Sequence, residues 1–283
     1  MKNRILVTGA SGNVGAAVLR NLKKDNADVV CASHNPEREG KRLAGETLVE
    51  LDFMRPETFE HAFVDIDSWF LMRPPQISDT EKYLWPAIDA AVDQGVKRIV
   101  FLSLLGIENN TRVPHWPVEE YLRTKNIDWT MVRPSFFMQN LSTTHRDEIA
   151  NGEIFLPVGQ GRTSFIDVED IGAVVAKSLT EEGHAGKAYE ITGPESLDYY
   201  QVAEMFTQEL EKPVVYKNPG VLPFLGYQLR QGRKLMHALV MCFLYLQTKR
   251  GMADVVNDQV EKLLGRKPVT MKEFITKNKT VWH

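Results

Sequence analysis

The fold of this chain is decided by the stretch Thr8-Gly9-Ala10-Ser11-Gly12-Asn13-Val14-Gly15. The stretch follows the apolar run Ile5-Leu6-Val7 and opens an amphipathic segment, so it predicts a strand, a glycine turn and a helix in succession. Gly9 would allow the tight turn, Gly12 would let the backbone approach a pyrophosphate, and Gly15 would let the helix pack on the strand. N–H groups at the helix start would then face the phosphates. The predicted phosphate-binding residues are Gly9, Ser11, Gly12, Asn13, Val14 and Gly15.

Composition limits the class of protein. The 283 residues are 43% hydrophobic, which suffices for one large domain or two unequal ones. A net charge of -3 gives no basic field, so we expect no nucleic-acid partner. Cys31 and Cys242 lie in separate apolar runs and are interpreted as buried thiols.

The sequence also predicts the cellular location of the protein. The first strand begins close to Met1, which leaves no room for a signal peptide, so we expect a cytoplasmic protein. The longest apolar run, residues 235–246, is too short to span a bilayer and is interpreted as a buried helix. We therefore expect no membrane partner.

Strand and helix patterns alternate along the first half of the chain. Apolar strands are predicted at 28–32, 47–51, 68–72, 98–102 and 129–134, with helical segments between them. This alternation is typical of an α/β protein with a Rossmann-type, doubly wound parallel sheet. We expect residues 1–152 to form the NAD(P)-binding domain, with 163–193 returning to the sheet. Residues 153–162 and 194–283 would form a smaller, mainly helical substrate or cap region.

Ligands of such sheets bind beyond the carboxyl ends of the strands. The candidate cofactor-binding residues at those ends are Ser33, His34, Asp52, Phe53, Met72, Arg73, Pro74, Ser103, Pro134 and Phe136. Phe53 would either bracket an adenine or pack in the core. Arg73 would either reach a phosphate or an acidic substrate, or point to solvent.

Cofactor preference depends on the end of the second strand. A carboxylate there would bind the ribose hydroxyls and repel a 2′-phosphate, but Ser33 and His34 follow the strand and Arg38 comes shortly after. The sequence therefore favours NADPH over NADH, with Arg38 at the 2′-phosphate. Lys41 and Arg42 are interpreted as a solvated helix face.

Several loose motifs occur in order along nearly the whole chain. They are the glycine stretch, Gly95-Val96-Lys97-Arg98-Ile99-Val100 leading to Ser103, His115-x-x-x-Glu119-x-x-Leu122, Thr130-x-x-Arg133-Pro134-x-x-Phe137-x-x-Asn140, Asp167-Val168-x-Asp170-Ile171 and Tyr189-x-x-Thr192-Gly193-Pro194. Together they resemble the NmrA-like branch of the atypical short-chain dehydrogenase/reductases. That family contains NAD(P)H-dependent quinone, azo-dye and triphenylmethane reductases, and also redox-sensing regulators that bind dinucleotide.

The resemblance implies a catalytic position. Ordinary short-chain dehydrogenases use Tyr-x-x-x-Lys, and Tyr121 and Lys125 have that spacing. The Glu-x-x-Leu pattern at Glu119, however, aligns His115 with the catalytic lysine and Thr111 with the tyrosine. We expect His115, with a pKa near neutral pH, to hold the nicotinamide ribose or to pass a proton; the alternative is a structural contact.

The missing tyrosine bears on the substrate. Carbonyl chemistry needs a positioned acid, whereas a quinone or extended dye accepts hydride and can take its proton from solvent. Flat acceptors suit a pocket built from Trp116, Phe137 and Asn140, with Phe136 nearby, although each aromatic ring could equally be core.

We therefore expect an NADPH-dependent oxidoreductase that transfers hydride to a quinone-like or other conjugated aromatic acceptor. One alternative is an NAD(P)-binding, redox-sensing regulatory protein of the NmrA type without significant turnover. Another is a sugar-nucleotide epimerase-like enzyme, against which the lack of an aligned Tyr-x-x-x-Lys counts. We expect a monomer or homodimer and no metal.

Overall fold

The computed structural model describes residues 3–283, which divide into two compact units. Unit 1 comprises the described residues up to Pro134 and the segment Val168–Ile191; unit 2 comprises Ser135–Asp167 and Thr192–His283. The sequence pattern places the first boundary at residue 152, whereas residues 135–152 belong to unit 2. The reason is apolar packing, because Met138, Leu141 and Ile149 are buried in the core of unit 2.

Unit 1 is built on a seven-stranded sheet in which every neighbouring pair of strands is parallel. The strand order is β3-β2-β1-β4-β5-β6-β9, the order of a doubly wound Rossmann fold with one further strand. The strands are β1 (Arg4–Thr8), β2 (Asp28–Ser33), β3 (Thr47–Glu50), β4 (Ser68–Met72), β5 (Arg98–Leu102), β6 (Asp128–Pro134) and β9 (Lys187–Ile191). The predicted fold class is confirmed.

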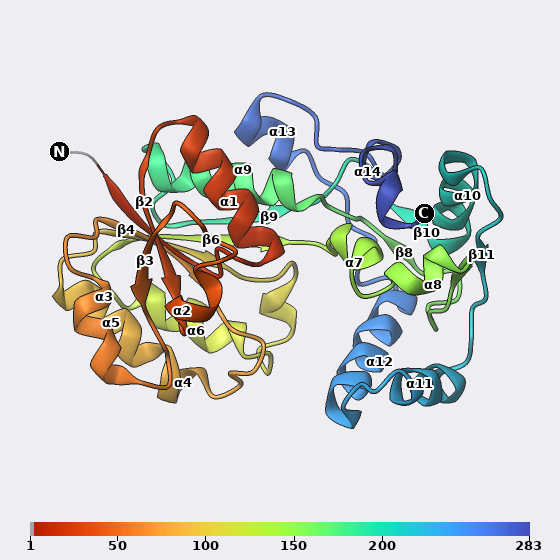
Figure 1. Cartoon of the computed structure of the whole chain (residues 1–283), viewed down its shortest axis with the longest axis horizontal. Coiled ribbons are helices and arrows are strands. Elements are labelled where there is room, and N and C mark those ends of the chain that lie inside the picture. Colours follow the sequence, from red (N-terminus) through yellow and green to blue (C-terminus); the bar gives the residue numbers. More distant parts are fainter. Residues whose placement is uncertain (1–2) are drawn as a thin grey trace. The chain divides into compact units, whose positions relative to one another are not determined.

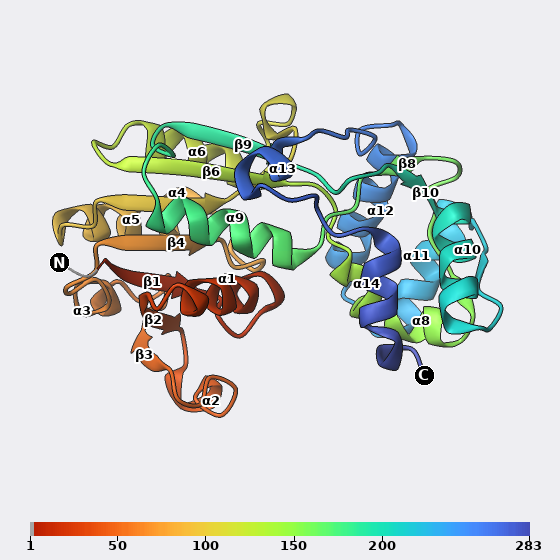
Figure 2. The same ribbon diagram turned by 90° about the horizontal axis from the view of Figure 1, so that it is seen from above.

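Helices cover both faces of this sheet. Figure 1 shows α1 and α9 above it and α3, α5 and α6 below it, and Figure 2 shows α9 running along the strands. The helical segments of unit 1 are α1 (Asn13–Lys24), α2 (Pro36–Glu39), η1 (Pro56–Thr58), α3 (Phe59–Ala62), α4 (Thr80–Tyr83), α5 (Trp85–Asp93), η2 (Ile107–Asn109), α6 (His115–Arg123) and α9 (Val168–Thr180). Both faces of the central strands are therefore shielded from solvent, and every residue of β5 is buried.

The contact between α1 and α9 depends on one glycine. A Cβ atom at Gly172 would lie 2.6 Å from the carbonyl carbon of Ala17 and 2.8 Å from its Cβ. An ion pair between Arg20 and Glu169 joins the same two helices at the surface. The backbones can approach this closely only without a side chain at position 172, so α9 holds the first helix against the sheet.

Unit 2 is mainly helical and has its own apolar core. Its helices are α7 (Gln139–Ser142), α8 (Arg146–Ala150), α10 (Tyr199–Leu210), α11 (Val221–Arg230), α12 (Leu235–Lys249), α13 (Gln259–Leu264), α14 (Met271–Lys277) and η3 (Lys279–Val281). Two small sheets pair β8 (Arg162–Thr163) with β10 (Leu197–Asp198) and β7 (Glu153–Ile154) with β11 (Val215–Tyr216). The core centres on Phe206, Phe224, Phe274 and Trp282, all of which are buried.

Two sequence interpretations need correction. The run 235–246 does form a helix, but it is not a buried one, because one face of α12 is exposed. Lys41 and Arg42 are solvated but lie in turns after the end of α2, since a helix does not continue beyond Glu39.

The expectation for the two cysteines is confirmed. Cys31 and Cys242 are buried free thiols, and burial raises the pKa of Cys31 to about 11. Among the described residues, no helix has the length and apolar content needed to cross a bilayer.

The role of Gly172 can be tested by Gly172→Ala. The added methyl group would clash with the backbone of α1, so we expect the free energy of unfolding to fall by about 1–3 kcal/mol in urea denaturation. Gly226→Ala in α11 is the control, because nothing lies within 4 Å of its Cβ position. There the substitution should be neutral or stabilise by up to about 1 kcal/mol. Equal effects at the two positions would contradict the assignment.

Candidate cofactor and active site

A pocket of about 390 Å³ lies at the carboxyl ends of β1, β2 and β4. The predicted cofactor-binding residues that line it are Gly9, Ser11, Ser33, His34, Asp52, Phe53, Met72 and Pro74. The structure adds Thr8, Ala32, Glu39, Leu51, Met54, Pro75, Gln76 and Ile77. Since β1 and β4 are neighbours while the chain between them builds β2 and β3, the pocket sits where the strand order reverses, as in other doubly wound folds.

The glycine turn forms the floor of this pocket. Gly9 has a φ of 69°, a left-handed conformation that favours glycine, and its carbonyl accepts a 2.9 Å hydrogen bond from the Gly12 N–H. A Cβ atom at Gly15 would lie 2.1 Å from the same carbonyl oxygen. Any side chain at Gly15 would therefore push α1 away from β1.

The start of α1 suits a phosphate group. Gly12 is the N-cap, no side chain caps the helix, and its first turn contains no acidic residue. The N–H groups of the first turn have no partner within the helix and lie at the positive end of its dipole. Together with the turn that only glycines permit, this donor set fits the pyrophosphate of a nicotinamide dinucleotide.

At the adenosine side of the pocket the charges differ from the prediction. Ser33 is buried and its hydroxyl accepts a hydrogen bond from the Asn35 N–H, which shapes the turn after β2. Arg38 is exposed and is not among the lining residues, whereas its neighbour Glu39 is. The sequence analysis missed Glu39, although its place directly after Arg38 was a signal that could have identified it.

Phe53 packs in the core and also forms part of the pocket wall. It lines the pocket, yet it is buried, with its ring centroid 6.3 Å from that of Trp69 in a stacked arrangement. Packing against Trp69 therefore fixes the orientation of the Phe53 ring in the pocket wall.

Arg73 folds the loop that forms one wall of the pocket. Its Nη1 donates hydrogen bonds to the carbonyl oxygens of Pro74 at 3.0 Å and of Ile77 at 2.5 Å. Pro74 and Pro75 have no N–H group and cannot donate backbone hydrogen bonds. The Arg73 side chain instead provides donors that hold the carbonyl oxygens of this loop in place. Arg73 thus points neither to solvent nor directly into the pocket; it shapes the wall.

His115 lies against Arg73 and is held in its neutral form. Nε of Arg73 is 3.5 Å from Nε2 of His115, and the ring centroid of Phe101 lies 5.9 Å from that of His115. Burial, and then the charge of Arg73, lower the pKa of His115 to about 3. The expectation of a pKa near neutrality is therefore wrong, because sequence spacing did not reveal the arginine beside the ring.

One atom of His115 has no partner within the described part of the chain. Nδ1 is buried and makes no hydrogen bond there. If Nε2 accepts from Arg73, the proton of the neutral ring resides on Nδ1, which becomes a donor without an acceptor. A buried donor of this kind is costly unless a ligand satisfies it.

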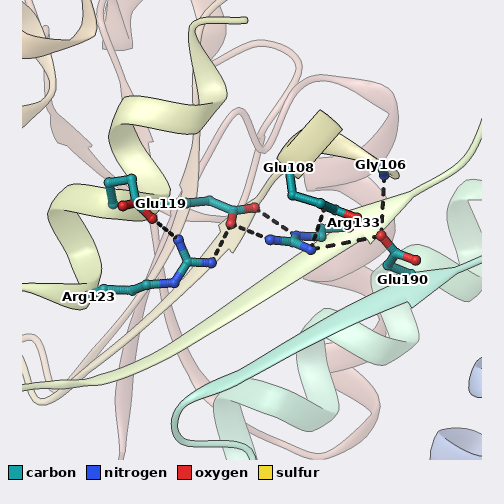
Figure 3. Close-up of polar contacts among 7 residues, drawn as sticks. Gly106, Glu108, Glu119, Arg123, Arg133 and Glu190 are labelled. Carbon is teal, nitrogen blue, oxygen red and sulfur yellow. Dashed lines mark hydrogen bonds and ion pairs between the residues drawn. The ribbon is translucent and has the colours of Figure 1, made fainter. Parts of the chain in front are cut away.

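The helix that carries His115 is fixed by a buried ion-pair network (Figure 3). Glu119 is fully buried and accepts hydrogen bonds from Arg133 at 3.0 and 2.7 Å and from Arg123 at 2.8 Å. Arg133 also pairs with Glu108 at 2.9 Å and lies 3.8 Å from Glu190. The network therefore joins α6 and η2 to strands β6 and β9.

The electrostatics of this network are consistent with a charged Glu119. Burial alone would raise its pKa, but the hydrogen bonds and positive charge of Arg133, together with the hydrogen bond from Arg123, outweigh burial, and the pKa is lowered. Ser103, a predicted cofactor residue, is buried and is not among the residues that line the pocket. Removing one partner would leave a buried charge unpaired, so the network holds α6 and its first residue, His115, in one position.

Tyr121 and Lys125 face a different part of unit 1. The Tyr121 hydroxyl donates to Asp89 at 2.7 Å, and its ring stacks on Trp85 with centroids 4.1 Å apart. Burial, with Asp89, raises the pKa of Tyr121 despite the nearby Lys125. A catalytic tyrosine needs a lowered pKa, so this pair has neither the location nor the electrostatics of a catalytic dyad.

The remaining predicted residues fall into two groups. Gly12 is the N-cap of α1, the residues from Asn13 to Gly15 form its first turn, and Pro134 ends β6. Trp116 follows His115 on α6, and Arg123 lies over its ring at 5.6 Å. Phe136, Phe137 and Asn140 belong to unit 2, where Phe136 packs against its core. Their roles in cofactor or substrate binding stay predictions.

These features define a Rossmann-type fold whose glycine turn and pocket fit a nicotinamide dinucleotide. The model of the NmrA-like family matches residues 1–275, and the chain belongs to this family. Its similarity to NAD(P)H-dependent enzymes over nearly the whole chain identifies it as an NAD(P)H-dependent reductase of this atypical branch of the short-chain dehydrogenase/reductases.

Individual relatives agree with this assignment. The NAD(P)H azoreductase of Xenophilus azovorans is 29% identical, with 95% of this chain and 96% of that protein covered. Two solved structures share the fold: the NADPH-dependent quinone oxidoreductase of Escherichia coli complexed with NADPH (23% identity, TM-score 0.87, 96% and 99% covered) and the Citrobacter sp. triphenylmethane reductase complexed with NADP(H) (23% identity, TM-score 0.86, 97% and 99% covered).

The Arg73 contact can be tested by following the ring nitrogens of His115 by NMR during an acid titration. The wild-type ring should stay neutral until about pH 3. In Arg73→Met the pKa should rise, because a positive charge is removed, yet remain below 6.5, because burial is unchanged. Arg55→Met, at an exposed arginine that pairs with Glu50, should leave the titration unchanged. A wild-type midpoint near 6.5 would contradict the assignment.

Proposed function

We propose that this protein reduces quinone-like or other conjugated aromatic acceptors, using NADPH in preference to NADH. The observation that carries the proposal is the geometry of His115: its buried Nδ1 has no partner among the described residues, and burial beside Arg73 lowers the pKa of the ring to about 3. Such a ring cannot deliver a proton as an imidazolium at neutral pH. It can donate a hydrogen bond from Nδ1, and a nicotinamide ribose hydroxyl is the acceptor that we assign to it.

Neither Thr111 nor Tyr121 is placed to act as the proton donor in place of His115. Thr111, which the family resemblance aligns with the catalytic tyrosine, is exposed, and Tyr121 has a raised pKa and contacts Asp89. An acceptor that needs no enzyme proton donor is therefore favoured: a quinone takes up a hydride to give an oxyanion, which water then protonates. The azoreductase and quinone oxidoreductase among the similar proteins support this acceptor class.

The protein's contribution is to bind and align. Bound NAD(P)H would supply the hydride. The glycine turn and the start of α1 would hold the pyrophosphate, while the loop shaped by Arg73 would close one wall of the pocket. The network around Glu119 would keep His115 in register with the ribose. Proximity and orientation would then provide most of the acceleration.

Cofactor preference depends on two adjacent side chains of opposite charge. Arg38 is an exposed arginine that a 2′-phosphate would recruit, while Glu39 lines the pocket and would oppose a phosphate placed beside it. We assign the 2′-phosphate to Arg38, because Ser33 and His34, at the strand end itself, carry no negative charge and Arg38 is the first arginine that follows them.

Turnover is tested by following NADPH and NADH oxidation at about 340 nm with a panel of quinones, azo dyes and aldehydes. We expect turnover of quinones or azo dyes and none of simple aldehydes. In His115→Ala, kcat/KM should fall about tenfold, the value of one lost hydrogen bond to a ligand, with no change in the shape of the pH profile between about pH 5 and 8.

His61→Ala, at an exposed histidine in α3, serves as the control and should retain wild-type rates. Tight dinucleotide binding without turnover of any acceptor would contradict the reductase proposal and favour a dinucleotide-sensing regulator. A pH profile in wild type that titrates near 6.5 and is lost in His115→Ala would contradict the assigned role of His115.

The cofactor assignment is tested by calorimetric titration of both dinucleotides. Arg38→Ala should weaken NADPH binding roughly tenfold and leave NADH binding nearly unchanged, because only NADPH carries the 2′-phosphate. Glu39→Gln is the matched variant and should strengthen NADPH binding more than NADH binding. Equal effects of Arg38→Ala on both cofactors would remove Arg38 from the 2′-phosphate site.

A further inference from the structure

Helix α12 presents an apolar face to solvent. Its buried face is formed by Ala238, Met241, Cys242, Tyr245 and Thr248. Apart from His237 and Lys249, the exposed residues of α12 are large and apolar: Leu235, Met236, Leu239, Val240, Phe243 and Leu244. Met236 is 71% exposed and Phe243 is 49% exposed. A helix that is hydrophobic on all sides normally lies inside a core, so this exposed face needs a partner.

The helix that precedes α12 also exposes large apolar side chains. α11 precedes α12 through a short turn, and Figure 1 shows the two joined in unit 2. Leu222 of α11 is 79% exposed and Leu229 is 41% exposed. We call the exposed apolar residues of α11 and α12 the α11–α12 face. Two helices therefore expose apolar side chains at one hairpin.

Charge around this face has one sign. Residues 212–253 contain no aspartate or glutamate, in a chain whose net charge is -3. The basic residues of this segment are Lys212, Lys217, Arg230, Arg233, Lys234, Lys249 and Arg250. Lys217 pairs with Glu153, and Lys212 donates to backbone carbonyls.

The basic residues at the two ends of α12 are available to a partner. Arg230 and Lys234 flank the turn between the helices, and Lys249 and Arg250 follow the other end of α12. In the described part of the chain none of these four has a carboxylate within ion-pair distance. The apolar face is thus bracketed by unpaired cations.

From these observations we propose that the α11–α12 face docks on an anionic lipid bilayer and makes the protein a peripheral membrane protein. Apolar side chains would enter the interface, and the flanking lysines and arginines would contact lipid phosphates and carboxylates. Apolar burial and a basic cluster are the two signals that stable peripheral binding needs. With 15 residues, α12 is too short to cross the hydrocarbon core, so it would lie at the surface.

A second copy of the chain fits this face less well. A two-fold dimer brings the same patch of each subunit together, which would place the cations of one copy against those of the other. No carboxylate in residues 212–253 could neutralise them. An anionic bilayer supplies the opposite charge and an apolar layer at once.

The proposal does not rest on the reductase function, and its test needs no turnover. Full-length protein is sedimented with vesicles of phosphatidylcholine alone and with vesicles that contain about one-quarter phosphatidylserine. We expect binding to the anionic vesicles, at least tenfold weaker binding to neutral ones, and loss of binding at high salt.

Two double variants separate the contributions. Arg230→Gln with Lys234→Gln should weaken binding to anionic vesicles by about fivefold per charge removed. Met236→Asp with Phe243→Asp should abolish binding; both side chains are exposed, so the fold should tolerate the change, which circular dichroism checks. The matched controls are Lys24→Gln with Lys277→Gln for charge and Val64→Asp for apolar exposure, and each should bind as wild type.

Some outcomes would overturn the proposal. One is the absence of binding to anionic vesicles by wild type. Another is equal binding to both vesicle types, or binding that Met236→Asp with Phe243→Asp leaves intact. A wild-type dimer in analytical ultracentrifugation that this variant converts to monomer, without vesicle binding, would assign the face to a second copy instead.

Discussion

The approach of the Gly9 carbonyl to the start of α1 is the contact on which the rest of unit 1 depends. The Gly12 N–H donates a hydrogen bond to this oxygen. A Cβ atom at Gly15 would lie only 2.1 Å from it, so position 15 tolerates no side chain. This contact seats α1 on β1, and Gly172 then lets α9 pack on α1. Two glycine contacts therefore fix the helix whose N-terminus faces the pocket.

Two arginines determine the position of α6 and the protonation state of His115. Arg133 is the partner of a buried carboxylate and anchors α6, while Arg73 holds the pocket loop and lies beside His115. The same α6 helix thus carries an anchored Glu119 and a neutral His115 one turn apart. A histidine that its surroundings keep uncharged can bind and orient a ligand, but it is a poor proton donor.

Unit 2 has a buried apolar core and, in addition, an apolar helix face that is exposed to solvent. Its core buries aromatic side chains such as Phe206, Phe224 and Trp282, yet α12 leaves an equally apolar face outside. Exposing such a face costs solubility unless it has a function. The proposed membrane-binding hairpin and the dinucleotide pocket belong to different units of the chain.

The sequence by itself determined the sheet, the glycine turn and the pocket-lining strand ends, because these depend on local features: apolar periodicity, glycine at positions that tolerate no Cβ, and polar residues at the ends of strands. It also identified His115 and the family through ordered motifs. Only the tertiary structure decided the state of that histidine, since its pKa depends on burial and on Arg73, 42 residues away along the chain. Likewise, Glu39 reaches the pocket and one face of α12 remains exposed through packing between distant segments, which the composition of a single segment cannot reveal.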